Sequence, residues 1–381
     1  MEIIYDLNYL GKEGFGGISR MWMELFRRLP SAPIEPTFIV GPAANKTQTF
    51  LEENAYFGGK VIHENPLWPK VSRFWFARTL RLLELNRRPG KAIFHSTDFI
   101  NPLFRRKDLK LVTTIHDMVF WDQWRRFRKN VDYFSSVASI MHSLAVCDRI
   151  VTVSYAAKAS IVKRFPAAEG KIEVIYHGLH ESFRRLELSG RREKALLFLG
   201  ARNYHKNYDL LLEAFAAFVR KNPEWRIWAV GENAHLKAQE DAKYARLGIA
   251  DKIVDHGMIP EAKLMELFGR AGALVIPSLN EGFNFPLLEG MAAGIPVLSS
   301  DIPVSRELGR DFVRYFSPTS AAELLRELER LEGEPFPERL LAAAQVHARS
   351  FTWDESMKKL VAKAVLCAES DEIRRLLEQN P

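Results

Sequence analysis

Residues 273–294 read ALVIPSLNEGFNFPLLEGMAAG, and this stretch contains the pattern on which the fold rests. Four apolar residues, Ala273–Ile276, form a buried type of strand, and a loop with a glycine follows. Pro286 suits the first turn of a helix, and Gly294 suits the end of one. The stretch therefore predicts a strand, a loop and a helix in succession, with Glu281 in the loop at the carboxyl end of the strand.

The same alternation of short β-branched runs and helical patterns extends over most of the chain, as is typical of parallel sheets with crossover helices. In the first half we expect strands at Glu2–Leu7, Thr37–Val40, Ala92–Ser96, Leu109–Ile115, Arg149–Val153 and Ile172–Tyr176, with helices at Ile18–Leu29, Ser135–Val146 and Ala156–Arg164. The pattern then restarts, with strands at Ala195–Leu199, Arg226–Val230, Lys252–Asp255, Ala273–Ile276 and Val297–Ser299 and helices at Tyr208–Lys221, His235–Leu247, Glu261–Gly269 and Pro286–Ala293.

The 381 residues exceed the roughly 250–300 at which a single core stops growing, so two domains are expected. The polar stretch Phe183–Lys194 reads as the linker, which places one α/β domain at residues 1–186 and a second at 187–350. Residues 351–381 begin with an amphipathic helix that we expect to pack back on the first domain. Two such domains would form a crevice at the carboxyl ends of both sheets, where α/β folds bind ligands.

Several classes of protein are excluded by composition. No run approaches the ~18 apolar residues of a membrane span, and Met1–Tyr5 lacks the basic flank and apolar stretch of a signal peptide, so a cytosolic location is expected. The two cysteines, Cys147 and Cys367, cannot build a zinc site alone and are expected to be small buried hydrophobes. No Asp-x-Asp motif follows a strand, so no bound divalent metal is implied.

The loop and helix of residues 277–294 predict a ligand that combines phosphate with hydroxyl groups. The start of the helix offers N–H groups and about half a positive charge, which suit a phosphate. An ionised carboxylate only accepts hydrogen bonds, so Glu281 and Glu289 require hydroxyl donors, such as those of a sugar or a ribose. A nucleotide-sugar meets both requirements. The alternative is a plain pair of charges at a helix N-terminus.

Three further motifs follow strands. Arg202 and Lys206, after the strand Ala195–Leu199, suit a diphosphate leaving group, because fixed cations stabilise the charge that grows as its bond breaks; a solvated basic loop is the alternative. The glycines of residues 14–17 let the backbone approach a phosphate or sugar, although the lysine of a P-loop is missing. His116 ends the strand Leu109–Ile115, and Asp117 could fix its tautomer.

Together these motifs resemble those of the family-four retaining glycosyltransferases, which have the GT-B fold of two Rossmann-like domains facing a central cleft. The segment from Glu281 to Glu289 is similar to the family's Glu-x7-Glu motif, and the likeness covers most of the chain. The resemblance implies that Glu281 binds hydroxyls of the donor sugar, that Glu289 binds the ribose, and that Arg202 and Lys206 bind the diphosphate. It implies that further donor contacts come from His116, Gly16, Gly17, Gly282, Phe283, Asn284, Phe285 and Leu288.

The resemblance also implies the chemistry. Transfer would retain the anomeric configuration without a covalent intermediate or metal, and the departing phosphate would take the proton of the acceptor. Gly-Gly-Ile-Ser-Arg at residues 16–20 resembles mannosyltransferases of bacterial O-antigen and capsule assembly, which implies GDP-mannose as donor substrate and no other cofactor. UDP-glucose and UDP-N-acetylglucosamine remain alternatives. The family's Gly-Gly-Ala-Ala stretch is reduced here to residues 309–312, which puts the donor contacts of that loop in doubt.

The charge is divided unequally. Residues 1–190 carry 28 basic and 19 acidic side chains, an excess of +9, whereas residues 191–381 carry 26 and 28, an excess of −2. Basic and aromatic residues are interleaved in Trp68–Lys91 and Trp121–Lys129, which favours a peripheral contact with an anionic membrane or lipid-linked acceptor. A solvated basic face over core aromatics and, less favoured, a surface for nucleic acid are the alternatives. A GT-B epimerase and a non-catalytic module that binds anionic polymers are the rival functions.

Overall fold

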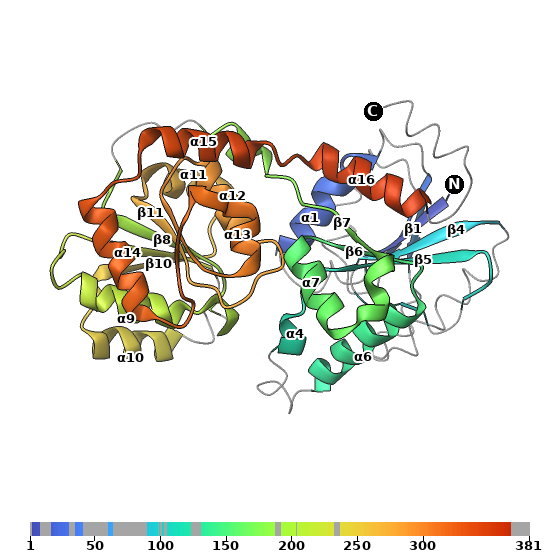
Figure 1. Cartoon of the computed structure of the whole chain (residues 1–381), viewed down its shortest axis with the longest axis horizontal. Helices are drawn as coiled ribbons and strands as arrows, with labels where there is room; N and C mark the ends of the chain where they lie inside the picture. Colours follow the sequence, from blue (N-terminus) through green and yellow to red (C-terminus); the bar gives the residue numbers. More distant parts are fainter. Residues whose placement is uncertain are drawn as a thin grey trace. The chain divides into compact units, whose positions relative to one another are not determined.

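The computed structural model describes residues 2–7, 17–29, 35–40, 60–63, 90–97, 99, 101–102, 105–122, 131–186, 192–202, 204–231 and 237–366. The chain divides into two compact units, Met1–Gly178 with Thr352–Pro381, and Leu179–Phe351 (Figure 1). The expected boundary at 186/187 lies too far along the chain. The short helix α8 (Glu181–Arg184) belongs to the second unit, because its buried Phe183 packs edge-on against Phe268 with 4.9 Å between ring centroids.

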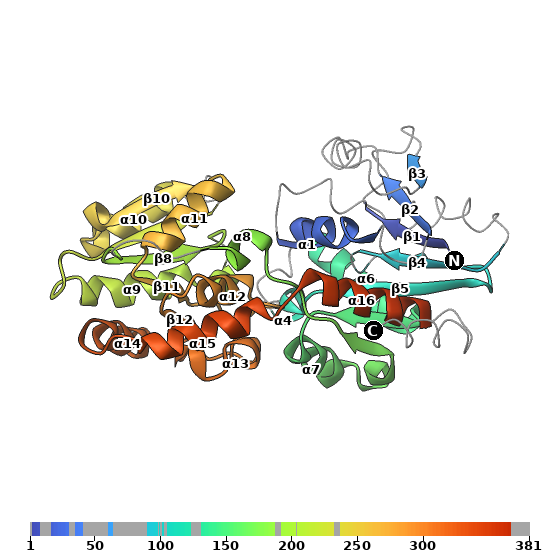
Figure 2. The ribbon, with the colours of Figure 1, turned by 90° about the horizontal axis from the view of Figure 1, so that it is seen from above.

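The first unit has a parallel sheet of seven strands in the order β3-β2-β1-β4-β5-β6-β7, part of which Figure 2 shows from above. The strands are β1 (Glu2–Asp6), β2 (Glu35–Val40), β3 (Lys60–His63), β4 (Ala92–Ser96), β5 (Leu109–Ile115), β6 (Arg149–Thr152) and β7 (Ile172–Val174). The helical segments are α1 (Gly17–Phe26), α4 (Val119–Asp122), α6 (Val131–Val146), α7 (Tyr155–Arg164), η3 (Pro166–Lys171) and α16 (Trp353–Leu366).

The C-terminal helix α16 packs on the first unit. Ser356 donates its hydroxyl hydrogen to the carbonyl of Tyr176 at 2.6 Å, and Arg28, just after α1, pairs with Asp354 at 3.0 Å. Gly178 meets the backbone of Trp353 so closely that a Cβ atom would overlap it. These contacts hold α16 against segments of the first unit that are more than 170 residues away in the chain, as the hydrogen bond between residues 176 and 356 illustrates.

The second unit has a parallel sheet of six strands in the order β10-β9-β8-β11-β12-β13. The strands are β8 (Ala195–Leu199), β9 (Arg226–Val230), β10 (Ile253–Gly257), β11 (Ala273–Ile276), β12 (Val297–Ser300) and β13 (Arg314–Phe316). Figure 1 shows α9 (Tyr208–Phe218), α10 (Lys237–Leu247) and α14 (Ala321–Gly333) along one face, and α11 (Glu261–Arg270), α12 (Phe285–Ala292) and α13 (Pro303–Gly309) along the other. The remaining helical segments are η4 (Tyr204–Lys206), η5 (Ala250–Lys252), η6 (Arg310–Phe312) and α15 (Glu338–Arg349).

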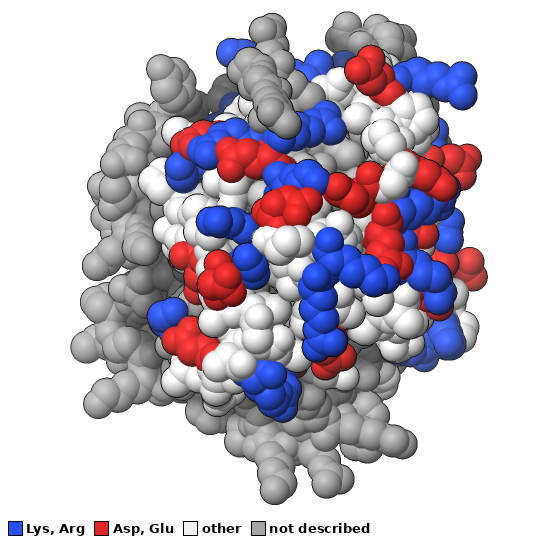
Figure 3. Space-filling model, turned by 90° about the vertical axis from the view of Figure 1, so that its left-hand side faces the viewer, with Lys and Arg blue, Asp and Glu red and all other residues white. Residues whose placement is uncertain are grey.

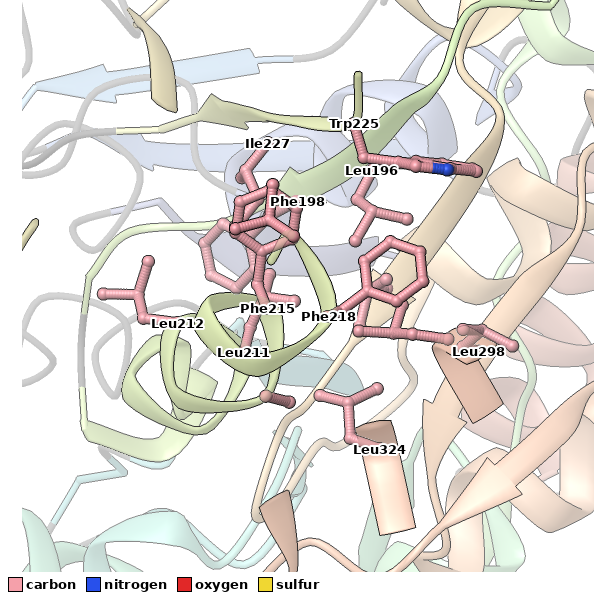
Figure 4. Packing of buried hydrophobic residues seen from close by; sticks show 14 of the residues in the cluster. Leu196, Phe198, Leu211, Leu212, Phe215, Phe218, Trp225, Ile227, Leu298 and Leu324 are labelled. Atoms are coloured by element: carbon pink, nitrogen blue, oxygen red, sulfur yellow. The ribbon is translucent and has the colours of Figure 1, made fainter. Parts of the chain in front are cut away.

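Apolar spacing explains why α9 lies on this sheet. Leu211, Phe215 and Phe218 recur at helical spacing and are fully buried against strand residues such as Leu196 and Ile227 (Figure 4). Burial of one such side chain contributes about 1.5–3 kcal/mol, so this face holds the helix in place. The start of α9, which follows the loop after β8, is thereby fixed at the carboxyl edge of the sheet.

The surface of the second unit has mixed charge. Basic and acidic side chains are interspersed over the face that Figure 3 shows, in agreement with the near-zero charge of the second half of the chain. Charged side chains of this unit also form ion pairs, as Lys194 does with Glu224 at 2.7 Å and with Glu332 at 2.5 Å. Among the residues that the structure describes, no helix combines the length and the apolar character needed to span a membrane.

Candidate active site

The loops after β8 and β11 meet at the carboxyl edge of the second sheet, because these two strands are parallel neighbours. Lys206, at the end of η4, places its Nζ atom 2.6 Å from Oε1 of Glu281. Ser278 donates its hydroxyl hydrogen to the same carboxylate oxygen at 2.7 Å. The side chains of Lys206 and Glu281 remain 19% and 12% exposed, so solvent reaches both. The structure thus brings together two of the residues that the sequence singled out.

This arrangement leaves hydrogen-bonding capacity for a ligand. A lysine ammonium has three donors, and within the described part of the chain that of Lys206 uses one, toward Glu281. Both hydrogen bonds that Glu281 accepts from described residues fall on Oε1, which leaves Oε2 to accept from others. A cation with unused donors beside a carboxylate with an unused acceptor can hold an anionic group and a hydroxyl group side by side.

The helix α12 begins beside this pair. Pro286 lies in its first turn, and Asn284 precedes it in the left-handed conformation with φ 59°. Asn284 does not cap the helix with its side chain; its Nδ2 donates to Oγ of Ser305 at 3.0 Å. Gly282 and Phe283 are buried, and the Phe283 ring lies 5.2 Å from that of Phe285. The loop is therefore a packed turn that leads into a helix, and the contact of its amides with a donor stays a prediction.

Leu288 and Glu289 follow within α12. Leu288 is completely buried, so its side chain belongs to the core and only its backbone could face a ligand. Glu289 is partly buried, and its carbonyl accepts the amide hydrogen of Ala293 at 2.9 Å. The assignment of Glu289 to a ribose stays a prediction.

Arg202 does not extend from the sheet edge as expected. Its side chain is 2% exposed, and its guanidinium lies 3.3 Å from Oδ1 of Asp255 and 3.4 Å from Oε1 of Glu240. It also donates to the carbonyl of Gly200 at 2.9 Å and lies over the Tyr208 ring at 4.7 Å. Burial of a cation requires such partners. The sequence motif did not predict that either carboxylate would pair with Arg202, because Glu240 and Asp255 are 38 and 53 residues away from it in the chain.

His205 lies between the two cations in sequence and is not a third one. Burial lowers the pKa of His205 below its ordinary value of 6.5, and the neighbouring charge of Lys206 lowers it further, while Glu281 raises it. The imidazole is therefore neutral near pH 7. The backbone carbonyl of His205 accepts the amide hydrogen of Leu279 at 2.7 Å, and this bond connects the loop after β8 to the loop after β11.

In the first unit, His116 follows β5 and belongs to a group of histidines. Its ring centroid lies 6.2 Å from that of His177, which stacks on Trp353 at 5.7 Å. Burial and, to a lesser extent, the neighbouring charge of His116 lower the pKa of His95 to about 3 and that of His177 well below 6.5. Oδ1 of Asp117 accepts the amide hydrogen of Val119 at 2.9 Å at the start of α4, and its effect on the His116 tautomer stays a prediction.

The other predicted residues of the first unit are described only in part. Gly17 is the exposed first residue of α1, whereas Gly16 lies outside the described residues. The basic aromatic stretches Trp68–Lys91 and Trp121–Lys129 also lie almost entirely outside them. No cluster of three or more His, Cys, Asp or Glu side chains that could hold a metal ion occurs in the described parts of the chain.

Comparison with known families decides the classification. The model of glycosyltransferase family 4 matches residues 15–183, and that of glycosyl transferases group 1 matches residues 181–347. The chain belongs to the family-four glycosyltransferases. Between them the two matches cover most of both units and every residue of the site described above except those of α16.

Among the relatives of this glycosyltransferase is the O-antigen chain mannosyltransferase RfbU of Salmonella typhimurium, which is 28% identical over 72% of this chain and 74% of its own. A D-inositol 3-phosphate glycosyltransferase of Streptomyces avermitilis is 31% identical over 56% of this chain. That match spans about half of the Streptomyces protein, 51% of its length.

Solved structures confirm the predicted GT-B fold. Sucrose-phosphate synthase of Thermosynechococcus elongatus superposes with a TM-score of 0.69 at 16% identity, over all of both chains. The lipopolysaccharide outer core galactosyltransferase WaaB superposes with a TM-score of 0.66 at 18% identity, over 96% of this chain and 99% of its own. At these identities the likeness establishes the fold of the glycosyltransferase and not its substrates.

Proposed function

We propose that the protein is a retaining hexosyltransferase that moves mannose from GDP-mannose to a glycan or lipid-linked saccharide during synthesis of a bacterial surface polysaccharide. The observation on which this rests is the contact of Lys206 with Glu281, 2.6 Å at the carboxyl edge of the second sheet and beside the start of α12. The kinship with a protein named as an O-antigen mannosyltransferase supports mannose and the acceptor class.

In this proposal each group acts where charge or hydroxyls of the donor would lie. Lys206 and the start of α12 neutralise the diphosphate as the bond between it and the sugar breaks. Glu281 accepts hydrogen bonds from sugar hydroxyls through Oε2, and Glu289 accepts them from the ribose. His116 contacts the sugar. Arg202 reaches the diphosphate by exchanging its buried carboxylate partners for phosphate oxygens.

The reaction balances without a further reagent. The acceptor oxygen forms a bond to the anomeric carbon on the face that the diphosphate leaves, and the bond from that carbon to the phosphate oxygen breaks. The departing phosphate takes the proton of the acceptor hydroxyl. The fixed cations supply the positive charge, so the proposal predicts that chelation of divalent metals leaves the rate unchanged.

Calorimetric titration with GDP-mannose, UDP-glucose, UDP-N-acetylglucosamine and an ADP-sugar tests the donor, and NMR of the product tests the anomeric configuration. Binding of GDP-mannose and an α-linked product are expected. Binding of a UDP-sugar instead would replace the donor while the transferase role stands. A free UDP-sugar isomer formed without acceptor would favour an epimerase, and affinity for none of the four donors would contradict the proposal.

A further inference from the structure

The turn that carries Lys206 is fastened to the loop that carries Glu281 on both sides of the lysine. On one side the carbonyl of His205 accepts the amide hydrogen of Leu279 at 2.7 Å. On the other side Nδ2 of Asn207 donates to the carbonyl of Pro277 at 2.9 Å. The contact between the ammonium and the carboxylate therefore lies between two cross-links that join the same two loops.

Asn207 makes this second cross-link at a cost in backbone conformation. It precedes α9 with φ 53° and ψ 38°, a left-handed conformation that costs a residue other than glycine roughly 1 kcal/mol. An asparagine before a helix commonly caps that helix with its own side chain, but Asn207 makes no such bond. Its side chain is thus available for other segments.

The amide of Asn207 ties three loops together. A carboxamide has two N–H donors, and both are used: one toward the carbonyl of Pro277 after β11 and one toward the carbonyl of Pro318 after β13, each at 2.9 Å. Lys206, one residue earlier, packs its aliphatic stem against Gly200, where a Cβ atom would lie 3.3 Å from the lysine Cδ and Cε. The side chain of Lys206 is therefore held by Gly200, and its backbone is held by the hydrogen bonds of the next residue, Asn207.

We propose that Asn207 is a positioning residue, whose two side-chain hydrogen bonds and left-handed backbone hold the Lys206 ammonium against Glu281 and so toward the diphosphate of the donor. The catalytic part of this inference rests on the function proposed above. The positional part does not, because it concerns contacts within the ligand-free protein. The two parts call for two readouts.

Three variants separate the contributions. Asn207→Gly removes both side-chain bonds but still adopts positive φ without strain, so it is the variant expected to fold normally. Asn207→Ala removes the bonds and adds backbone strain. Asn222→Ala is the matched control, because Asn222 also donates its Nδ2 hydrogen to a carbonyl, that of Phe218 at 3.1 Å, just after the other end of α9.

The first readout is the rate of reductive methylation of Lys206 in the full-length protein without ligand, followed by mass spectrometry against Lys221, whose side chain is 77% exposed. An ammonium that is bonded to a carboxylate must leave it before it reacts, so the relative rate at Lys206 should rise about fivefold or more in both Asn207 variants. It should not change in Asn222→Ala. An unchanged rate in Asn207→Gly would overturn the positioning role.

The second readout is steady-state transfer with the donor that the wild-type protein binds. Misplacement of a group that acts mainly in the transition state lowers kcat more than it raises KM. We expect kcat of Asn207→Gly to fall about 20-fold with the donor KM changed less than about threefold, and Asn207→Ala to be slower still. Faster methylation with an unaltered kcat would refute the catalytic part alone. A wild-type protein that is inactive with every donor would refute the proposed function and leave the methylation result standing.

Discussion

Replacement of Arg202 by methionine tests what this cation does in the ligand-free protein. The guanidinium, 2% exposed, lies 3.3 Å from Asp255 and 3.4 Å from Glu240 and over the ring of Tyr208. Methionine keeps an unbranched apolar stem that can still pack on the tyrosine, but it removes the charge and all five donors. Arg202→Met should therefore leave two carboxylates in the interior without the cation between them, although the Tyr244 hydroxyl still donates to Glu240 and the Gly257 amide to Asp255.

The size of the loss follows from the burial of those carboxylates. Removal of one member of a buried ion pair costs about 3–5 kcal/mol. The side chains of Glu240 and Asp255 are 10% and 18% exposed, so water partly compensates them and we expect the lower end, about 3 kcal/mol. In a unit of this size 1 kcal/mol shifts the melting temperature by about 2–4 °C, so the second unit should melt about 6–12 °C lower.

Differential scanning calorimetry measures this shift for each unit, and urea unfolding gives the free energy. Lys206→Met is the control, because Lys206 is more exposed and Glu281 keeps the hydrogen bond from Ser278; it should cost about 1 kcal/mol. Adding Asp255→Asn to Arg202→Met should recover about 1–2 kcal/mol. If Arg202→Met unfolded within about 0.5 kcal/mol of the wild type, the buried network would not be what holds Arg202.

Three other predictions concern activity, pH and packing. Lys206→Ala and Glu281→Ala should each lower turnover at least ~100-fold, or ~2.7 kcal/mol, and near-normal kcat in either variant would remove that residue from the mechanism. The pKa of His95 is about 3 in the folded protein, compared with an ordinary value of 6.5. Between these two pH values the unfolded chain therefore binds more protons than the folded protein. The stability contributed by the neutral ring is complete above pH 6.5 and is lost as the pH falls toward 3. One such group contributes a slope of about 1.4 kcal/mol per pH unit, and His177 contributes in the same direction, so His95→Gln should reduce the slope of the unfolding free energy between pH 7 and 4 without abolishing it; an unaltered slope would contradict this assignment. Gly178→Ala would place a Cβ atom against the backbone of Trp353, so it should destabilise the first unit by about 1–3 kcal/mol and shift the tryptophan fluorescence, and a wild-type melting curve would refute the close packing.

The sequence predicted the central strands of both sheets and failed at two of their edges. The strands β3 (Lys60–His63) and β13 (Arg314–Phe316) were not expected, and each is an edge strand of its sheet. A strand with neighbours on both sides in a parallel sheet is covered by helices and reads as an apolar run. An edge strand such as β13, where only Phe316 of the three residues is buried, lacks that run.

The sequence also identified Lys206 and Glu281 but not the groups that hold them. Both residues follow strands, and the carboxyl ends of neighbouring parallel strands lie at the same edge of a sheet, so their proximity could be foreseen. The hydrogen bonds of Asn207 to Pro277 and Pro318 could not, because they join loops 70 and 111 residues away. No local pattern distinguishes an asparagine that caps its own helix from one that fastens other loops.

By itself, the order of apolar and polar residues determined two α/β units and the strand ends that bear the charged motifs, because side-chain periodicity and helix or turn signals act within a few residues along the chain. Only the tertiary structure decided that Arg202 is enclosed by Glu240 and Asp255 while Lys206 stays open to solvent. The reason is that burial of a charge depends on which distant segments pack around it, and neighbours in the sequence do not set that environment.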